Sequence, residues 1–222
     1  ISNKIGYPVL LKASAGGGGK GMRIVRKNSE LEENFNAAKS ESKKSFGDDR
    51  VFIEKYIEQP RHIEIQILCD KHGNQVHLGE RECSIQRRYQ KVIEECPSPF
   101  VDEEMRNEMA AQALTLAKEV KYDSAGTVEF VVDANKNFYF LEMNTRLQVE
   151  HPVSELVTGV DLVEQMIYCA DNKKLNISQK DINLKGWSVE SRIYAEDPTK
   201  DFLPSIGSCL LYTSPSPRDF TE

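Results

Sequence analysis

A β-hairpin is predicted by the stretch Thr127-Val-Glu-Phe-Val-Val-Asp-Ala-Asn-Lys-Asn-Phe-Tyr-Phe-Leu-Glu-Met-Asn144. Two short runs of β-branched and aromatic residues flank the polar segment 134–137, which has the composition and length of a hairpin turn. If Asp133 pairs with Phe138, the pairing of the remaining strand positions follows from this one pair. The rest of the predicted fold is organised around this hairpin.

One face of the hairpin concentrates acidic and amide side chains. In the predicted register Glu129 stands opposite Glu142, with Cβ atoms about 4.5–5.5 Å apart, where like charges repel. Asn144 points to the same face, and Val131 opposite Phe140 is the next pair, so we expect half-buried carboxylates. Adjacent buried carboxylates must share a proton or a cation.

Two carboxylates and an amide oxygen are hard ligands that suit Mg²⁺ or Mn²⁺. Because Mg²⁺ usually keeps water and phosphate oxygens among its ligands, a bound nucleotide is predicted beside Glu129, Glu142 and Asn144. The alternative is a surface hairpin whose glutamates reach water.

Composition bounds the class of protein. The chain has 222 residues, of which 39% are hydrophobic and 29% charged, as in soluble globular proteins of one large domain or two modest ones. A net charge of −6 does not favour nonspecific binding to nucleic acid. No apolar run approaches the ~18 residues of a membrane span. The chain starts at Ile1 without a signal-like segment, so we expect an internal piece of a longer protein.

The cysteines indicate a reducing, cytosol-like compartment. They are odd in number and show no CxxC spacing, which argues against a disulfide framework and against a zinc site. The five are Cys69, Cys83, Cys96, Cys169 and Cys209.

A glycine-rich loop lies near the start of the chain. Residues 7–12 and 22–26 read as strands, and between them lies Ala13-Ser-Ala-Gly-Gly-Gly-Gly-Lys-Gly21. A strand follows where a Rossmann loop would need a helix, and no Gly-Lys-Ser/Thr occurs, so neither a Rossmann nor a Walker A motif is present. Four consecutive glycines expose backbone N–H groups, and Lys12 and Lys20 add charge. We interpret the loop as a flap that cradles phosphate; a plain flexible turn is the alternative.

The middle of the chain predicts further strands and a helix. Strands are expected at 51–57, 61–68 and 75–83, and an amphipathic helix at 102–121. The polar, cationic run 84–91 between them is typical of a solvated loop, with a ligand-binding role as the alternative.

A second polar cluster follows the hairpin directly. If the strand continues past Asn144, then Arg146, Gln148 and Glu150 lie on the face that carries Glu129 and Glu142. Such a face is costly to bury unless an ion and a substrate compensate its charges. An extended, exposed loop is the alternative.

Several motifs together resemble biotin carboxylase, the ATP-grasp component of acetyl-, propionyl- and methylcrotonyl-CoA carboxylases and of pyruvate carboxylase. The resemblance runs from about residue 1 to Gly207. The glycine flap is shared with other ATP-grasp ligases, whereas the run 146–152, Lys91 and Arg192 in one chain are more specific. The motifs are Lys12-Ala-Ser-Ala-Gly-Gly-Gly-Gly-Lys-Gly-Met22, Glu54-Lys-Tyr-Ile57, Gln86-Arg-Arg-Tyr-Gln-Lys91, Glu142-Met-Asn-Thr-Arg-Leu-Gln-Val-Glu-His-Pro152 and Ser191-Arg-Ile-Tyr-Ala-Glu-Asp-Pro198.

The resemblance implies an α+β, ATP-grasp fold of two subdomains. Residues 1–57 would form the lid with the glycine-rich flap, residues 58–180 the core subdomain, and residues 187–207 the start of a C-terminal domain. The family's N-terminal domain and most of its C-terminal domain would be missing. Residues 208–222 do not continue the family's pattern, so we expect them to be non-native and disordered.

The resemblance also implies roles for individual residues. Glu129, Glu142 and Asn144 would hold the metal ions. Glu150 would be the general base on bicarbonate, and Arg192 would stabilise the enolate of biotin. Bicarbonate would be bound by Lys91, Arg146, Gln148 and the backbone N–H of Val149. The nucleotide would contact Lys12, Ala15, Gly16, Gly17, Gly18, Gly19, Met22, Glu54, Lys55, Ile57, His62 and Gln86.

The implied activity is ATP-dependent carboxylation of biotin on a carrier protein or domain. Bicarbonate would attack the γ-phosphoryl group of ATP, and the resulting carboxyphosphate would deliver CO₂ to deprotonated biotin. ATP, Mg²⁺ or Mn²⁺ and biotin are the expected cofactors and substrates. A carboxyltransferase and a homodimeric partner are expected for the full-length protein, in the cytoplasm or the mitochondrial matrix of a eukaryote. We expect this fragment alone to be inactive or nearly so.

Two other functions remain open. Another ATP-grasp ligase, such as a carbamoyl-phosphate synthetase half, also uses bicarbonate but needs no biotin, so Lys91 and Arg192 discriminate against it. A non-catalytic nucleotide-binding module would bind Mg-ATP and show no loss of function on Glu150→Gln.

Overall fold

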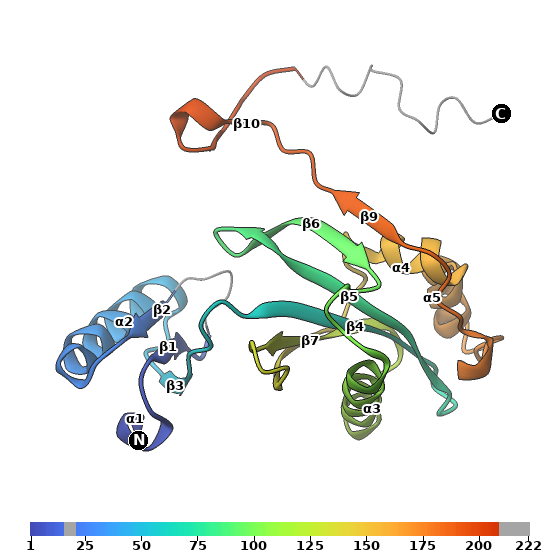
Figure 1. The fold of residues 1–222 in the computed structure, drawn as a ribbon, viewed down its shortest axis with the longest axis horizontal. Helices are drawn as coiled ribbons and strands as arrows, with labels where there is room; N and C mark the ends of the chain where they lie inside the picture. Colours follow the sequence, from blue (N-terminus) through green and yellow to red (C-terminus); the bar gives the residue numbers. More distant parts are fainter. Residues whose placement is uncertain (16–20, 209–222) are drawn as a thin grey trace. The chain divides into compact units, whose positions relative to one another are not determined.

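The computed structural model describes residues 1–15 and 21–208, and within them a three-stranded and a six-stranded antiparallel sheet with flanking helices (Figure 1). This confirms the predicted α+β class. Contacts divide the chain into a unit that ends at Ser191 and a second unit that starts at Arg192. The flap residues Gly16–Gly19 and the tail from residue 209 onward lie outside the described residues.

The first sheet is built from the strands predicted around the glycine-rich loop. Its strand order is β2-β1-β3, and helix α2 packs against it over a core that includes Val9, Leu11 and Val25. The loop therefore joins two antiparallel neighbours, β1 and β2. The elements of this part are α1 (Ser2–Ile5), β1 (Val9–Ala13), β2 (Met22–Val25), η1 (Asn28–Glu30), α2 (Leu31–Phe46) and β3 (Val51–Lys55).

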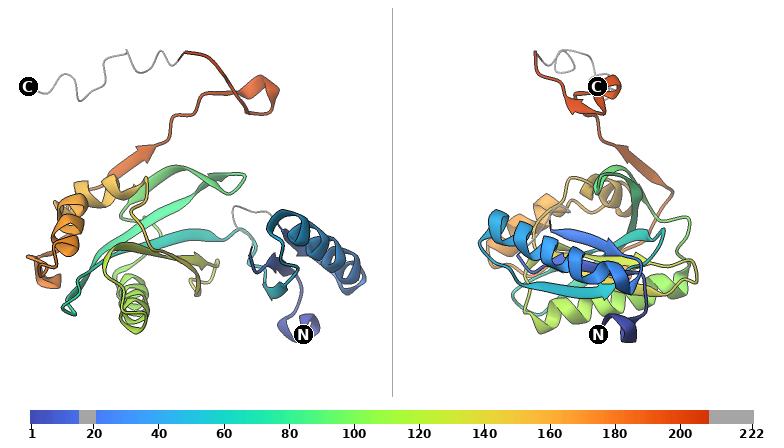
Figure 2. Two further views of the ribbon diagram at one scale, coloured as in Figure 1. Left: turned by 180° about the vertical axis from the view of Figure 1, so that it is seen from behind. Right: turned by 90° about the vertical axis from the view of Figure 1, so that its left-hand side faces the viewer.

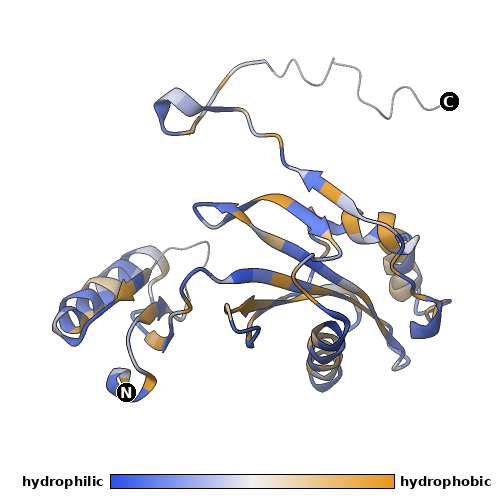
Figure 3. Cartoon of the chain, viewed as in Figure 1, coloured by the Kyte–Doolittle hydropathy of each residue, from blue (hydrophilic) through white to orange (hydrophobic). Residues whose placement is uncertain are grey.

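The second sheet has the strand order β8-β7-β4-β5-β6-β9. Polar and apolar residues alternate along its strands (Figure 3), and α3 packs against one face of the sheet (Figure 2). The elements of this part are β4 (Arg61–Cys69), β5 (Gln75–Arg87), β6 (Gln90–Cys96), α3 (Glu103–Glu119), β7 (Ser124–Val132), β8 (Phe138–Asn144), α4 (His151–Thr158), α5 (Leu162–Ala170), η2 (Gln179–Asp181) and β9 (Ser188–Ser191).

The alternation in β4 assigns its two faces. Ile63, Ile65 and Ile67 join the core beneath α3, so Glu64 and Gln66 point to the opposite face of the sheet. Both are nevertheless fully buried. A second buried layer must therefore cover that face and satisfy these polar side chains.

The β7–β8 hairpin has the predicted register only in the half far from its turn. Glu129 is paired with Glu142, as predicted, but a bulge at this point shifts the remaining pairs. Phe140 consequently stands opposite Phe130, and the predicted pair of Val131 with Phe140 is wrong. A bulge of this kind adds one residue to one strand and turns the following side chains to the other face.

Two other boundaries differ from the sequence prediction. β8 ends at Asn144, so residues 145–150 form an irregular segment that ends in a turn rather than a continued strand. β5 extends to Arg87 and pairs with β6, so the predicted loop 84–91 is mostly a hairpin. Cross-strand pairing overrode the polar composition of that segment.

The second unit contains three short elements, of which β10 and β11 pair antiparallel. They are β10 (Glu196–Asp197), η3 (Pro198–Lys200) and β11 (Leu203–Pro204). Among the described residues of the whole chain, no helix has the length and apolar character needed to cross a membrane. Cys69, Cys83, Cys96 and Cys169 are buried free thiols.

Gly126→Ala is expected to destabilise the fold by about 1–3 kcal/mol, because a Cβ atom there overpacks the core. That atom would lie 2.7 Å from Cε1 of Tyr122, and the ring is held in place because its hydroxyl donates to the carbonyl of Ala125 at 2.7 Å. Urea denaturation of both proteins measures the change. In a Tyr122→Ala background the same substitution should cost clearly less, and equal costs in the two backgrounds would contradict this explanation.

Candidate active site

A buried ammonium group lies at the centre of the candidate site. Nζ of Lys91, on β6, donates to carboxylate oxygens of Glu64, Glu129 (3.0 Å) and Glu150 (2.6 Å). The side chain of Lys91 is only 12% exposed, and the three acids are 0–4% exposed. Because an ammonium has three N–H donors, each proton of Lys91 meets one carboxylate.

The sheet brings these groups together from distant parts of the chain. Glu64 on β4 and Glu129 on β7 are direct cross-strand partners, so their side chains share the face opposite α3. Glu150 stands at the N-cap of α4. The buried neighbour of Glu129 is thus Glu64, whereas Glu142 is exposed. The expectation that Glu142 is half-buried is wrong, because it lies on β8, the edge strand of the sheet.

Opposite charges keep this cluster ionised despite its burial. Burial alone would lower the pKa of Lys91, but the charges of Glu64, Glu129 and Glu150 raise it well above its usual value. Burial likewise opposes ionisation of Glu64, yet Arg81 and Lys91 lower its pKa. Lys91 and Glu64 therefore hold opposite fixed charges rather than a shared proton.

Glu129 is the most heavily contacted acid. One of its oxygens accepts from Lys91, from Asn144 Nδ2 (2.9 Å) and from Gln148 Nε2 (2.9 Å). The other oxygen lies 2.8 Å from Nε2 of His62. Although burial raises its pKa, the contacts with His62 and Lys91 outweigh burial and lower the pKa to about 2.

In chelator-containing buffer, the low pKa of Glu129 should make stability fall between about pH 4.5 and pH 2. Glu129 favours folding above its unfolded-state pKa and loses that contribution, on the order of 3 kcal/mol, as pH drops through its folded-state pKa. Urea denaturation of wild type and Glu129→Gln across this range measures the effect. The variant should show a shallower loss; parallel curves would contradict the assignment.

A second buried cation, the guanidinium of Arg81, also contacts the cluster. Arg81 on β5 is fully buried, and its Nε donates to Glu64 at 2.6 Å. Neither Glu64 nor Arg81 was predicted from the sequence as a site residue. The only signal for Glu64 was its place between isoleucines in an alternating strand, which shows its face but not that the face is covered.

Glu129, Glu142 and Asn144 fit a hard divalent cation by their chemistry. They supply two carboxylates and an amide from adjacent strands, with Glu129 opposite Glu142 and Asn144 opposite Thr127. His62, Glu64 and Glu129 also place one ligand atom each within 4.8 Å of one another.

Of the other residues predicted to bind bicarbonate or nucleotide near this cluster, only some belong to it. Gln148 is buried in it, whereas the side chains of Arg146 and Val149 are exposed. Arg146 does not share a strand face with Glu150, because β8 has already ended. Gln86 donates to the carbonyl of Cys83 at 2.9 Å.

The predicted nucleotide residues of the first sheet are partly paired with one another. Nζ of Lys12 lies 3.5 Å from Glu54, and Lys12 is the cross-strand partner of Met22. Lys55 donates to the carbonyls of Gly6 and Tyr7. Ala15, at the start of the loop, is exposed, and Ile57 follows β3. Arg192 belongs to the second unit.

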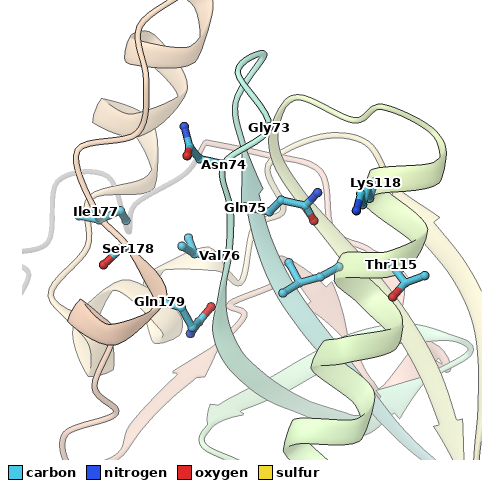
Figure 4. Close-up of a pocket in the computed structure, with 10 residues that line it drawn as sticks. Gly73, Asn74, Gln75, Val76, Thr115, Lys118, Ile177, Ser178 and Gln179 are labelled. Atoms are coloured by element: carbon cyan, nitrogen blue, oxygen red, sulfur yellow. The ribbon is translucent and has the colours of Figure 1, made fainter.

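A separate cavity of about 480 Å³ lies at the β4–β5 turn (Figure 4). It is bounded by Gln75 and Val76 of β5, by Thr115 and Lys118 of α3, and by residues 177–179. None of the predicted site residues lines it, so it is not part of the candidate active site.

Residues 1–178 match the family model described as the carbamoyl-phosphate synthase L chain, ATP binding domain. The propionyl-CoA carboxylase alpha chain of Ruegeria pomeroyi is 66% identical over 97% of this chain, which spans 32% of that relative. The mitochondrial propionyl-CoA carboxylase alpha chain of Homo sapiens is 62% identical over 97% of this chain, which spans 30% of it. The chain thus spans about a third of the length of these relatives.

Two solved structures are similar to most of this chain. One is the biotin carboxylase domain dimer of the Hydrogenobacter thermophilus 2-oxoglutarate carboxylase, in complex with MgADP, ADP and bicarbonate, with a TM-score of 0.87 and 55% identity. The other is a biotin carboxylase–β-γ-ATP complex from Campylobacter jejuni, with a TM-score of 0.87 and 53% identity. Each similarity covers 92% of this chain and 45% of the other chain.

Proposed function

The chain belongs to the family of carbamoyl-phosphate synthase L chain ATP-binding domains, and we propose that it is the ATP-binding part of a biotin carboxylase. The complete protein would be an ATP-dependent ligase that carboxylates biotin on a carrier protein or domain with bicarbonate. The observation that carries this proposal is the ammonium of Lys91 held among Glu64, Glu129 and Glu150 in a buried site. A relative bound to MgADP and bicarbonate supports the same ligands here.

Lys91 is suited to bind a small anion beside a base. Its three N–H groups all meet carboxylates, so bicarbonate would bind by replacing one of them. Glu64 and Glu129 have further donors, Arg81 and Gln148 among them. A bicarbonate held by Lys91 would lie next to Glu150, whose oxygen is 2.6 Å from Nζ. Proximity of this kind allows Glu150 to take the bicarbonate proton.

The proposed metal site shares Glu129 with this anion site, and the nucleotide would bind with the metal. Glu129, Glu142 and Asn144 would hold a divalent cation, which when bound would neutralise charge on the triphosphate. The glycine-rich flap at 16–19 and Lys12 would contact the phosphates. Met22, Glu54, Lys55, Ile57, His62 and Gln86 would surround the nucleotide.

The remaining groups would act on bicarbonate and biotin. Arg146, Gln148 and the Val149 N–H would orient bicarbonate with Lys91. Arg192 would stabilise the biotin enolate, because a guanidinium placed where negative charge develops lowers the barrier. Closing the flap would keep water from carboxyphosphate.

The proposed subdomains are those predicted from the sequence. Residues 1–57 would form the lid, 58–180 the core subdomain and 187–207 the start of a further domain. A biotin carrier, a carboxyltransferase and a second copy of the subunit are the proposed partners, and the 222-residue chain alone would be inactive or nearly so.

ATP cleavage by the complete protein tests the proposal, with free biotin as the acceptor. ADP release should require both bicarbonate and biotin, and omission of either should return it to background. ADP release that needs bicarbonate and ammonia but not biotin would indicate a carbamoyl-phosphate synthetase instead. ATP binding without any bicarbonate-dependent cleavage would indicate a non-catalytic module.

A further inference from the structure

The guanidinium of Arg81 uses every one of its donors. An arginine has five N–H groups in a fixed planar arrangement, and each finds an acceptor here although the side chain is fully buried. The acceptors come from β4, β7, α4 and the turn before α4. They are Glu64 Oε1 (2.6 Å), Gln66 Oε1 (2.5 Å), Ser154 Oγ (3.0 Å), Thr127 Oγ1 (3.1 Å) and Gln148 Oε1 (2.9 Å).

These contacts determine which end of the Gln148 amide faces the anion site. A guanidinium can only donate, so Gln148 must present its oxygen to Arg81. Its NH₂ group is then turned to the other side, where it donates to Glu129 at 2.9 Å. A rotated amide would place two donors against the guanidinium and an oxygen against a carboxylate, and both contacts would be repulsive.

Arg81 controls Glu64 in the same manner. It engages one carboxylate oxygen, Oε1, at 2.6 Å, and this leaves Oε2 to accept from Lys91. The ammonium of Lys91 therefore has one hydrogen-bond acceptor, Glu64 Oε2, whose orientation is fixed by Arg81. Arg81 itself does not contact the anion-binding groups Lys91 or Glu150 in any of its five hydrogen bonds.

We propose that Arg81 is a positioning residue for the bicarbonate site, which acts through Gln148 and Glu64. The inference rests on the proposed function. Arg81 selects the orientation in which Gln148 offers its NH₂ group, and it holds Glu64 so that Lys91 is aimed at the same place. None of the five acceptors of Arg81 is among the residues proposed to bind the nucleotide or the metal.

A second arginine, Arg106, serves as a control that distinguishes positioning of the site from general stabilisation of the fold. Arg106 on α3 also pairs with a buried acid, since its Nε and Nη2 lie 2.5 and 2.8 Å from Glu80. None of its contacts reaches the Lys91 cluster. Arg106→Lys is therefore a control that loosens another arginine–glutamate pair, in which the arginine is 20% exposed, and leaves the site alone.

The test is Arg81→Lys in the complete protein, measured as ADP release with varied bicarbonate and varied ATP. Lysine keeps the charge, but its three donors sit on one atom and cannot reach five acceptors. We expect the KM for bicarbonate to rise by about tenfold or more, as for loss of a hydrogen bond to a charged group, with the KM for ATP unchanged. Arg106→Lys should leave both constants unchanged.

A double-mutant cycle shows whether Arg81 acts through Gln148. Gln148→Ala should raise the KM for bicarbonate in the wild-type background and have a much smaller effect when Arg81→Lys is present. A crystal structure of Arg81→Lys provides a readout independent of the reaction, because the side chain of Gln148 should be displaced from Glu129.

Several outcomes would overturn the inference. One is a folded Arg81→Lys with the bicarbonate KM of wild type; another is full additivity with Gln148→Ala. If Arg81→Lys does not fold, Gln148→Ala alone tests the same contact, and an unchanged KM for bicarbonate in that folded variant would overturn the inference. If ADP release by the wild-type protein did not depend on bicarbonate, the proposed function itself would be wrong. A displaced Gln148 in the crystal structure of Arg81→Lys would even then show that Arg81 positions Gln148.

Discussion

Lys91→Met is expected to lower the free energy of unfolding by about 3–5 kcal/mol near pH 7 in metal-free buffer, because removal of one partner leaves buried charges uncompensated. The ammonium contacts Glu64, Glu129 and Glu150, all of which are almost completely buried. Methionine fills a similar volume but offers no proton to any of them. The effect is measured by urea denaturation of wild type and variant in the same buffer.

The pH dependence of this loss provides a second check. Without Lys91, the pKa values of Glu64 and Glu129 should rise, so acidification protonates them and relieves their repulsion. The difference in stability between Lys91→Met and wild type should therefore narrow as the pH falls. A difference that stays constant with pH would show that lost packing, not charge, is responsible.

A surface lysine supplies the control for this substitution. Nζ of Lys136 lies 2.5 Å from Asp102, but both side chains are about half exposed. Lys136→Met should cost less than about 1 kcal/mol, because water screens an exposed ion pair. If the two variants were equally stable, the buried cluster would not be held together by Lys91.

Glu150→Gln is expected to reduce kcat for bicarbonate-dependent ATP cleavage by about a hundredfold or more, the usual contribution of a general base. The amide has nearly the same shape, and its oxygen can still accept from Lys91, which lies 2.6 Å away in the wild type. It cannot, however, take the proton from bicarbonate. Steady-state ADP release by the complete protein gives kcat, and a thermal melt verifies that the variant folds.

The matched control is Glu164→Gln, on the first turn of α5. Glu164 is exposed and lies outside the cluster, so its substitution should leave kcat unchanged. Full activity of Glu150→Gln would exclude Glu150 as the base. Glu150→Gln that binds ATP normally but is inactive would exclude the non-catalytic nucleotide-binding module.

Much of the site region could be predicted because its patterns are local. The alternation of Ile63, Ile65 and Ile67 identified a strand, and the composition of 134–137 identified a hairpin. Glu129 stands opposite Glu142, as predicted, only because the bulge offsets the register near the turn, where Val132 pairs with Phe138. The resemblance to biotin carboxylase and the ATP-grasp fold, both inferred from short motifs, are confirmed by the similar structures. The assignment of Glu129, Glu142 and Asn144 to a metal stays a prediction.

What the sequence could not show is which groups meet across the sheet. Two adjacent buried carboxylates were expected to share a proton or a cation. In the structure the buried pair is Glu129 and Glu64, and the cation between them is the ammonium of Lys91. Those contacts join β4, β6 and β7. No pattern in the run 84–91 distinguished a solvated loop from a strand that buries its lysine.

The amino-acid sequence by itself therefore determined the strands, the hairpin and the family, because side-chain alternation and turn composition act over a few residues. The tertiary structure alone decided the hairpin bulge, the burial of Glu64 and Arg81, and the convergence of three acids on one ammonium. The physical reason is that desolvation and charge pairing depend on what covers a face of the sheet, and those covering groups come from segments far apart in the chain.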